Sequence, residues 1–504
     1  MINTIQQAVK PHDKYQIEIK LDYELVEAKH THYKITTYFF VPQSLGIDKN
    51  NYSKAHFYRD VRNYIRLKTP NFILRDFSEN SASPLISIEK IIAAENWAGN
   101  PESKQRLIDN FKFLSAMLKS ATRDHFNLIE QRIAEAGPGS KIQVIIHNLI
   151  EAFLSESQKI TTSYRAFYAD FNLPNVDPQI FSAYKWTDES ISMLLEEQAI
   201  EIFQIVDAHA NQGDWTNFKQ QLNALVEAET QHRRSHGYSS ILQADSDNEA
   251  YIFRSSVLKK YAASILYLST AVRREGIGLE HFLFAIAAGV SMIFATVIAF
   301  YFQWRYGNFT FAFFAALVVG YMFKDRIKEL GRALFARYLE NALYDRRIVI
   351  RTQDDQYKLG VLKEKVTFIS EGDLPKRVMR VRNRDPFSQL ANNGHGEEII
   401  RYTKEVVLYT DVFKKIFAGL PQISGINDII RYDIRAYLNK MAEPVQERFY
   451  LQDEQLQAMD CHKVYHLNVV SRYASPYPEK GKLYKRSRLV LTQEGIKRVE
   501  HLLV

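Results

Sequence analysis

The sequence predicts a membrane protein of the α+β class, in which a two-helix transmembrane hairpin joins two cytoplasmic portions. Two long apolar runs near the middle of the chain predict the hairpin, and alternating apolar residues near the N-terminus predict strands. We therefore expect a mainly α-helical N-terminal portion that includes a β-hairpin, and an α+β C-terminal domain. The expected regions are 1–80 with the β-hairpin, 83–275 as a helical domain ending in a stalk helix, 282–323 as the transmembrane hairpin, 324–345 as a second stalk helix, and 346–504 as the α+β domain.

Composition excludes several classes of protein. The chain has 504 residues, of which 46% are apolar and 24% charged, so it is neither disordered nor collagen-like. This length favours two or three folded units. The single cysteine, Cys461, excludes an intrachain disulfide and a metal site built from cysteine alone. The first residues contain neither an apolar core nor a cleavage site, so we expect no signal peptide.

Two segments near the N-terminus alternate apolar and polar residues. One runs from Tyr15 to Leu25 and the other from Tyr33 to Val41. Strict alternation places the apolar side chains of a strand on one face. We expect the two segments to pair as a β-hairpin with one buried face, which needs further strands or a helical cover to be stable.

A helical pattern begins at Ser83 and continues to about residue 235, with Pro101 at the first position of one helix, where a missing amide costs nothing. The residues GPGS at 137–140 interrupt it. Two amphipathic stalk helices are expected on either side of the apolar runs, and they should pack on each other or on copies of themselves. Their apolar stripes are Val257, Tyr261, Ile265 and Leu268 before the runs, and Ile327, Leu330, Leu334 and Tyr338 after them.

The first apolar run, Phe282 to Phe302, has 21 residues and no charge. At 1.5 Å per residue it matches the roughly 30 Å hydrocarbon core of a bilayer. The second run consists of the 18 uncharged residues between Arg305 and Lys324. Both runs are therefore predicted to cross a membrane, although a pair of buried helices in a soluble protein is the alternative.

Cations near the ends of the runs predict the orientation, because Lys and Arg are retained on the cytoplasmic side. Residues 1–280 hold 31 Lys and Arg against 34 Asp and Glu, a net charge of −3, whereas residues 281–504 hold 34 against 24, a net charge of +10. We expect a bacterial-type inner membrane, both large portions in the cytoplasm, and contact with anionic lipid headgroups. The residues expected at the headgroups are Lys324, Arg326, Lys328 and Arg332.

Each run carries a stripe of small residues at a spacing of four, a pattern that lets helices approach closely in lipid. The stripes are Ala287, Ser291, Ala295 and Ala299 in the first run, and Ala312, Ala316 and Gly320 in the second. They fit packing within the hairpin or packing between copies in a homo-oligomer. Neither run contains an ionisable residue, which weighs against a charge-coupled transporter.

The loop between the runs reads Tyr306-Gly307-Asn308-Phe309. With a large N-terminal portion and a stalk helix before two spans, the chain is similar in outline to CorA-type divalent-cation channels, whose loop carries Gly-Met-Asn. The resemblance implies that Asn308 faces the entry of a pentameric pore. This chain departs from the pattern because the Met is missing and because 181 residues follow the second span. A deletion in a tight loop re-aims every later side chain.

The region after residue 346 contains β-prone segments, and the residues 383–398 are expected to form a surface loop. We hypothesise that these strands join the N-terminal strands in one sheet. The last residues resemble the strand-then-helix ending of winged-helix domains, with Thr492 capping the helix, which keeps nucleic acid open as a partner. The expected strands are RRIVIR, VTFIS, EEIIRYTKEVVLYT, VYHLNVVSRYAS and KLYKRSRLVLT.

Few residues suggest chemistry. The sequence has no phosphate-binding GxxxxGK[ST] loop, no GxGxxG, no HExxH, no GxSxG and no kinase motifs, so an enzyme is disfavoured. His30 and His32 would share one face of a strand and are candidates for a metal site; the alternative is a solvated hairpin tip that binds no metal. Cys461 lies between Asp460 and His462, but adjacent side chains usually diverge.

A basic cluster alternates partly along a strand-like segment and fits a lipid headgroup, a nucleic acid or a solvated edge. Its residues are Lys376, Arg377, Arg380, Arg382 and Arg384. The glycines of NNGHG, residues 392–396, offer only a weak phosphate signal. The sequence names no cofactor.

The sequence thus favours a membrane-anchored cytoplasmic binding, scaffold or regulatory protein, with a protein partner plausible. The alternatives are an oligomeric ion channel or transporter built from the hairpin, and a membrane-tethered enzyme without a recognisable motif.

Overall fold

The computed structural model describes residues 5–135, 141–209, 215–307, 310–384, 396–417, 421, 423–474 and 482–502. The chain divides into two compact units. The sheet unit consists of Met1–Ile65, Ser269–Val412 and Asn427–Val504, and the helical unit of Arg66–Leu268 and Phe413–Ile426. Both ends of the chain therefore contribute to one unit. Helix and sheet are mixed, as expected for the α+β class.

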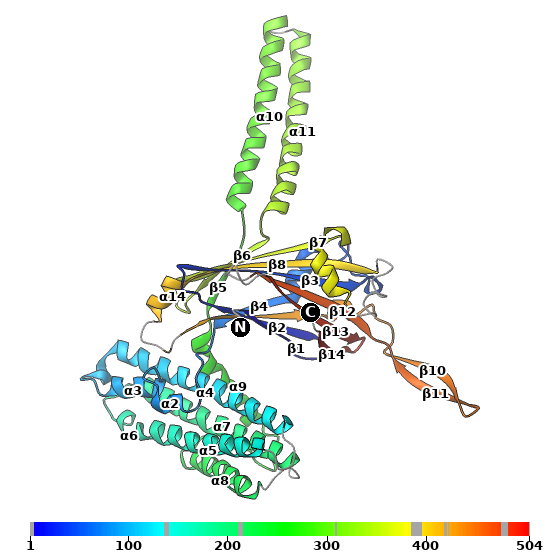
Figure 1. Cartoon of the computed structure of the whole chain (residues 1–504). Coiled ribbons are helices and arrows are strands. Elements are labelled where there is room, and N and C mark those ends of the chain that lie inside the picture. Colours follow the sequence, from blue (N-terminus) through cyan, green and yellow to red (C-terminus); the bar gives the residue numbers. More distant parts are fainter. Residues whose placement is uncertain are drawn as a thin grey trace. The chain divides into compact units, whose positions relative to one another are not determined.

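Two large sheets form the body of the sheet unit (Figure 1). The larger has eight strands in the order β14-β13-β12-β3-β8-β7-β6-β5, and the smaller has four in the order β1-β2-β9-β4. The strands of the larger sheet are β3 (His30–Pro42), β5 (Ser269–Arg274), β6 (Arg346–Arg351), β7 (Lys358–Ile369), β8 (Glu397–Tyr409), β12 (Tyr465–Ala474), β13 (Lys482–Thr492) and β14 (Gly495–Leu502). The strands of the smaller sheet are β1 (Ile5–Pro11), β2 (Gln16–Glu24), β4 (Val61–Leu67) and β9 (Gly425–Asp433).

Strands from the two ends of the chain share the larger sheet, which confirms the hypothesis made from the sequence. β3 lies between β12 and β8, and Phe39 is opposite Val469 on one side and Ile400 on the other. The five C-terminal segments expected as strands are β6, part of β7, β8, β12 and β13.

The predicted N-terminal β-hairpin is wrong, although both of its strands exist. β2 pairs with β1, with Ile19 opposite Val9, whereas β3 belongs to the other sheet. β3 is buried on both faces near its end, because Tyr38 and Phe40 pack against the helix α12 (Lys376–Arg382). A strand with two apolar faces is suited to the middle of a covered sheet rather than to a hairpin with one wet face.

The two sheets pack face to face around an aromatic core. The ring of Phe39 on β3 lies 5.2 Å from that of Tyr432 on β9, and Tyr23 on β2 lies 5.2 Å from Tyr33 on β3. Most residues of the alternating set are buried, as predicted, whereas Tyr15 is exposed and Leu25 half-buried at the two ends of the first segment. The buried residues are Ile17, Ile19, Leu21, Tyr23, Tyr33, Ile35, Thr37, Phe39 and Val41.

The helical unit contains the expected helical region. Its core is aromatic: Tyr164 stacks on Tyr184 at 4.9 Å, and Phe111 meets Phe171 at 5.4 Å. Its helices are α2 (Asp76–Glu79), α3 (Pro84–Ile92), α4 (Pro101–Glu135), α5 (Lys141–Ala166), α6 (Tyr168–Phe171), α7 (Pro178–Ala208), α8 (Thr216–Ser235) and α9 (Glu249–Ala263). The residues 137–140 lie outside the described part of the chain.

The remaining helices are short, apart from the two of the helical hairpin. The short ones are α1 (Lys54–Asp60), α12 (Lys376–Arg382), α14 (Thr410–Ile416) and α15 (Arg435–Leu438). The hairpin consists of α10 (Ile277–Tyr306) and α11 (Phe311–Ala342), which Figure 1 shows as an antiparallel pair.

The expected stalk helices differ from the structure. α9 ends at Ala263, and Ser269–Arg274 form β5, which pairs with β6. β-branched Thr270 and Val272 favour a strand there. After the second run no separate stalk begins, because α11 continues unbroken to Ala342.

Two further expectations from the C-terminal region are wrong. The last residues form the strand pair β13–β14, so Thr492 caps no helix; it lies opposite Gly495 in the ladder. The basic cluster is a helix, α12, rather than a strand-like segment. Its Arg382 is fully buried and pairs with Glu397, because a helical turn carries it inward.

A two-stranded ribbon, β10 (Val445–Gln452) and β11 (Gln455–His462), forms a separate third sheet. Every residue in both strands is exposed. A ribbon of two strands is at best marginally stable in water.

Candidate membrane hairpin and its root

The helices α10 and α11 pack against each other in one antiparallel register. A Cβ placed on Gly320 would lie 3.5 Å from Cγ2 of Ile298, and one placed on Gly331 would lie 3.0 Å from Cβ of Ala287. The guanidinium of Arg332 stands 5.7 Å from the ring centroid of Phe284. These three contacts, spread over both helices, agree on the register.

Four of the seven small residues that the sequence singled out are buried where the helices meet. They are Ala287 and Ser291 on α10, and Ala316 and Gly320 on α11. The others, Ala295, Ala299 and Ala312, are half-buried. The geometry thus uses the small side chains for close approach within the hairpin.

The outer face of α10 is apolar and open. Among the described residues, α10 is the one helix long and apolar enough to cross a membrane, and 11% of its most apolar 18-residue stretch is buried. Ile293, Val297 and Phe300 are each at least 60% exposed. A stretch of this kind costs free energy in water, because roughly 25 cal/mol is lost for each Å² of apolar surface left wet.

The outer face of α11 is different. Its first 13 residues, 311–323, are uncharged, but five charged residues follow within six positions. We call these five the charged strip: Lys324, Asp325, Arg326, Lys328 and Glu329. The expected second membrane span is therefore unconfirmed, because α11 is long enough but has no 18-residue stretch that is sufficiently apolar.

The cations expected at lipid headgroups have neighbours on the hairpin itself. Lys328 pairs with Asp325 at 3.2 Å, and Arg326 pairs with Glu329 at 3.2 Å. Lys324 lies 3.9 Å from the ring centroid of Tyr321. The pairs run along one helix and are exposed, so each contributes at most about 0.5 kcal/mol.

The turn of the hairpin is described only in part. Tyr306 is the last residue of α10, and Gly307 follows with φ 79° and ψ 174°, a positive-φ extended conformation that favours glycine. The hydroxyl of Thr310 accepts a hydrogen bond from the backbone N of Phe313 at 3.3 Å and caps α11. Asn308 and Phe309, which carry the resemblance to CorA-type channels, lie outside the described residues.

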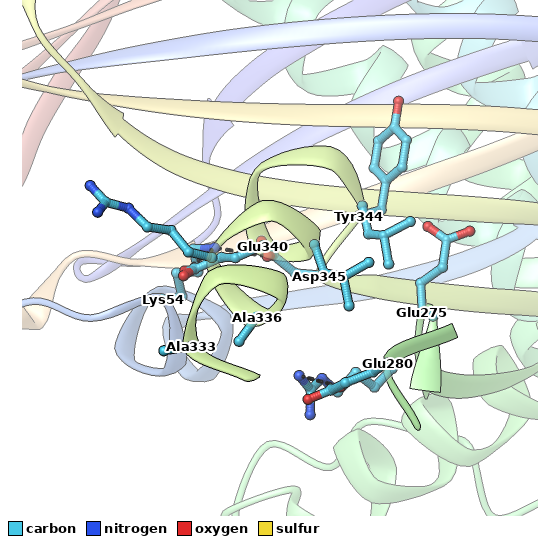
Figure 2. A pocket seen from close by; sticks show the side chains of 13 residues that line it. Lys54, Glu275, Glu280, Ala333, Ala336, Glu340, Tyr344 and Asp345 are labelled. Carbon is cyan, nitrogen blue, oxygen red and sulfur yellow. Dashed lines mark hydrogen bonds and ion pairs between the residues drawn. The ribbon is translucent and has the colours of Figure 1, made fainter. Parts of the chain in front are cut away.

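A cavity of about 540 Å³ lies at the root of the hairpin, where α10 begins and α11 ends (Figure 2). We define the root as residues 274–280 and 337–345. Charged side chains from the root and from α1 line the cavity, and they are Lys54, Arg274, Glu275, Glu280, Arg337, Glu340 and Asp345. Its volume suits a small ligand, although most of these charges are already paired.

Lys54 and Asp345 form the centre of the root. The Nζ of Lys54 lies 3.0 Å from a carboxylate oxygen of Glu340 and 3.0 Å from one of Asp345. Burial alone lowers the pKa of Lys54, but the hydrogen bonds and charges of the two carboxylates outweigh it and raise that pKa. Asp345 also accepts hydrogen bonds from the hydroxyl of Tyr58 at 3.0 Å and the backbone N of Val366 at 2.7 Å.

The sheet holds the ends of both hairpin helices. On β7, Lys365 donates hydrogen bonds to the carbonyl oxygens of Glu340 at 3.1 Å and Asn341 at 2.5 Å, which caps the C-terminus of α11. Lys363 on the same strand pairs with Glu275 at 2.6 Å. The residue before α10 is Gly276, with φ 79°. These contacts connect the hairpin to the larger sheet.

A second charged cluster is buried between the sheets. Lys404 pairs with Asp428 and lies 3.6 Å from Glu364, which accepts a hydrogen bond from the hydroxyl of Tyr402 at 2.5 Å. Burial raises the pKa of Asp428, against the lowering effect of Lys404. The adjoining cavity is about 10 Å³, room for no more than a single water molecule, so the cluster is suited to packing rather than to binding.

The structure does not bring the other suggested residues into a site. His30 and His32 lie exposed on β3 opposite Tyr409 and Val407, and no group of three or more metal-ligating side chains occurs in the described part of the chain. Cys461 is exposed on β11, where its neighbours Asp460 and His462 point to the opposite face.

The root was missed by the sequence analysis. Its contacts join residues near 54, 275, 340 and 365, which no local pattern links. In the sequence, Gly276 indicates only a break in the chain before the first apolar run.

Comparison with protein families, with characterised proteins and with solved structures finds no significant match to this chain.

Proposed function

We propose that the protein is anchored in a membrane by the α10–α11 hairpin and presents its two folded units as binding or scaffold modules on the cytoplasmic side. The exposed apolar face of α10 carries this proposal, because lipid is the surrounding that removes it from water at the lowest cost. The excess of cations after the apolar runs supports the orientation and an inner-membrane location.

The root supports a scaffold role. The ends of α10 and α11 are tied to the larger sheet by Lys363, Lys365 and the pair between Lys54 and Asp345. A hairpin held in this way positions the sheet unit at the membrane surface. Arg274 and Arg337 at the root then stand close to anionic headgroups, each worth about 1 kcal/mol.

Membrane fractionation tests the anchor. The paired substitution Val290→Lys and Ile293→Lys places two charges on the apolar face of α10, at about 2.5–3.5 kcal/mol each near the bilayer centre. We expect the variant to leave the carbonate-resistant membrane fraction. The matched control is Tyr338→Lys, on an exposed part of α11 that lies level with residue 280, before the apolar run begins at Phe282, and it should remain in the membrane.

Topology reporters test the orientation. Fused after Ser240 and at the C-terminus, both should report from the cytoplasm, and export of either would contradict the proposal.

A second candidate function is an ion channel or transporter made from several hairpins. One specific observation favours it: the charged strip of α11 lies beside the apolar run of α10. Within the described residues, no arrangement of side chains favours the other alternative, a membrane-tethered enzyme.

A further inference from the structure

The register of the hairpin places charged residues level with the middle of an apolar helix. Gly331 meets Ala287 and Gly320 meets Ile298, so the same antiparallel register sets Asp325 level with Ile293. Ile293 lies next to the midpoint of the run from Phe282 to Phe302. If this run fills the hydrocarbon core, Asp325 is close to the bilayer centre.

The whole charged strip lies within this core. At 1.5 Å per residue, its residues stand roughly 10 to 18 Å below the level of Phe282, in a core of roughly 30 Å. A single charge at the centre costs about 2.5–3.5 kcal/mol, and the ion pairs along α11 recover only a fraction of it. A lone hairpin surrounded by lipid would therefore be strongly disfavoured.

The hairpin itself does not cover the strip. The side chains of Arg326 and Glu329 are 83% and 64% exposed. The outward side of α10 at the same level is apolar, with Ile293 at 65% exposure and Val290 at 54%. One side of the hairpin thus suits lipid, and the other suits a polar partner.

We propose that several copies of this chain assemble in the membrane, with the charged strips of α11 facing one another and the apolar faces of α10 facing lipid. The strip has three cations and two anions, so identical strips are complementary and can pair Arg326 of one copy with Glu329 of the next. Ionisable side chains inside membranes generally face a bundle interior in this way. The inference rests on the proposed membrane anchor.

Only one other arrangement avoids burying the strip in lipid. The hairpin would then insert by its tip, residues 295–323, to a depth of about 18 Å, and the strip would stay in water. That arrangement leaves Phe282, Ile286 and Val290 on α10 exposed to water, which the assembly avoids.

Single cysteines in membranes distinguish the two arrangements. Cys461 is the chain's one cysteine, so Cys461→Ser gives a background for Ile293→Cys or for Leu330→Cys, an exposed position one helical turn from Arg326. In the assembly, Leu330→Cys forms a cross-linked dimer on oxidation, whereas Ile293→Cys does not and resists a membrane-impermeant maleimide. Full labelling of Ile293→Cys in a carbonate-resistant protein would overturn the proposal in favour of tip insertion.

Charge exchange tests the pairing in the full chain in lipid nanodiscs, where mass gives the number of copies. Arg326→Glu or Glu329→Arg should reduce the assembled fraction roughly tenfold, because an interhelical polar contact is worth up to about 1.7 kcal/mol. The double variant should restore assembly. A wild-type protein that is monomeric in the membrane would refute the assembly alone, whereas its absence from the membrane would refute the anchor.

Discussion

Asp188 of the helical unit and Asp325 of the hairpin both lie on long helices, α7 and α11, yet their surroundings differ. Asp188 is 2% exposed and accepts hydrogen bonds from Arg165 at 3.1 Å, His232 at 2.7 Å and the hydroxyl of Tyr238 at 2.9 Å. Asp325 has one partner, Lys328, on its own helix, and both are partly exposed.

The difference shows which charges the chain satisfies by itself. In the helical unit, side chains from separate helices converge on Asp188, and Arg165 also binds Glu229 through two hydrogen bonds at 3.1 and 2.6 Å. The charges of that network are therefore paired by side chains of the helical unit itself. The charged strip has no comparable cover within the described hairpin, so its surroundings must supply one.

The largest effect is expected from Asp188→Ala. Removing this buried carboxylate leaves the half-buried Arg165 without one of its two acidic partners, and breaking a buried pair in this way typically costs about 3–5 kcal/mol. Unfolding can be followed by tryptophan fluorescence in a Trp304→Phe background, which leaves only Trp97, Trp186 and Trp215, all in the helical unit.

The matched variant on the hairpin is Asp325→Ala in the same background. Its effect on helical-unit stability should be below about 0.5 kcal/mol, because an exposed pair along one helix contributes little. Equal losses for the two variants would contradict the contrast between the regions.

Lowering the pH should reduce the stability of the helical unit by a smaller amount than Asp188→Ala does. Burial alone raises the pKa of Asp188, but the hydrogen bond from His232 and the charge of Arg165 outweigh it and lower that pKa. A lowered folded-state pKa stabilises the folded form above the unfolded value of about 3.9, and the contribution disappears as pH falls through the folded value. Denaturant unfolding at pH 7 and at successively lower pH should show this loss, and Asp188→Asn should reduce its size.

A local effect is expected at the root. Gly276 has φ 79°, and a Cβ there would lie 2.1 Å from Cδ1 of Leu343. Gly276→Ala should destabilise the root by about 1–2 kcal/mol from the left-handed backbone, with the contact to Leu343 adding to it. Faster hydrogen exchange at residues 274–280 and 337–345 would measure it.

Gly278→Ala is the control for that experiment. A Cβ at Gly278 meets no atom within 4 Å, and its φ is not positive. Exchange at the root should therefore stay unchanged, and an equal acceleration would show that the effect is not due to Gly276.

Local patterns predicted the elements better than their partners. Alternation identified the inward side chains of β2 and β3, such as Ile19 and Phe39, because a strand repeats every two residues. The same pattern gave no information on pairing, and the two strands proved to lie in different sheets. The prediction for the basic cluster was wrong for a related reason. Arg382 is buried because it pairs with Glu397, which lies too far along the chain for the local spacing of the basic residues to indicate it.

The root is the clearest example of a feature that local sequence patterns could not predict. Lys54, Asp345 and Lys365 are ordinary charged residues in the sequence, and they become a site only when a helix, the end of α11 and a strand of the larger sheet meet. Nothing in their spacing along the chain carried that information.

By itself the sequence determined that a long apolar helix exists, where its uncharged run begins and ends, and which side chains of the N-terminal strands face inward. These features depend on residues that are only a few positions apart in the chain. Only the tertiary structure decided that β2 and β3 part, that the root is tied to the sheet, and that the charged strip lies beside the middle of α10. Those features depend on register between distant segments, whose free energy comes from contacts that no single segment contains.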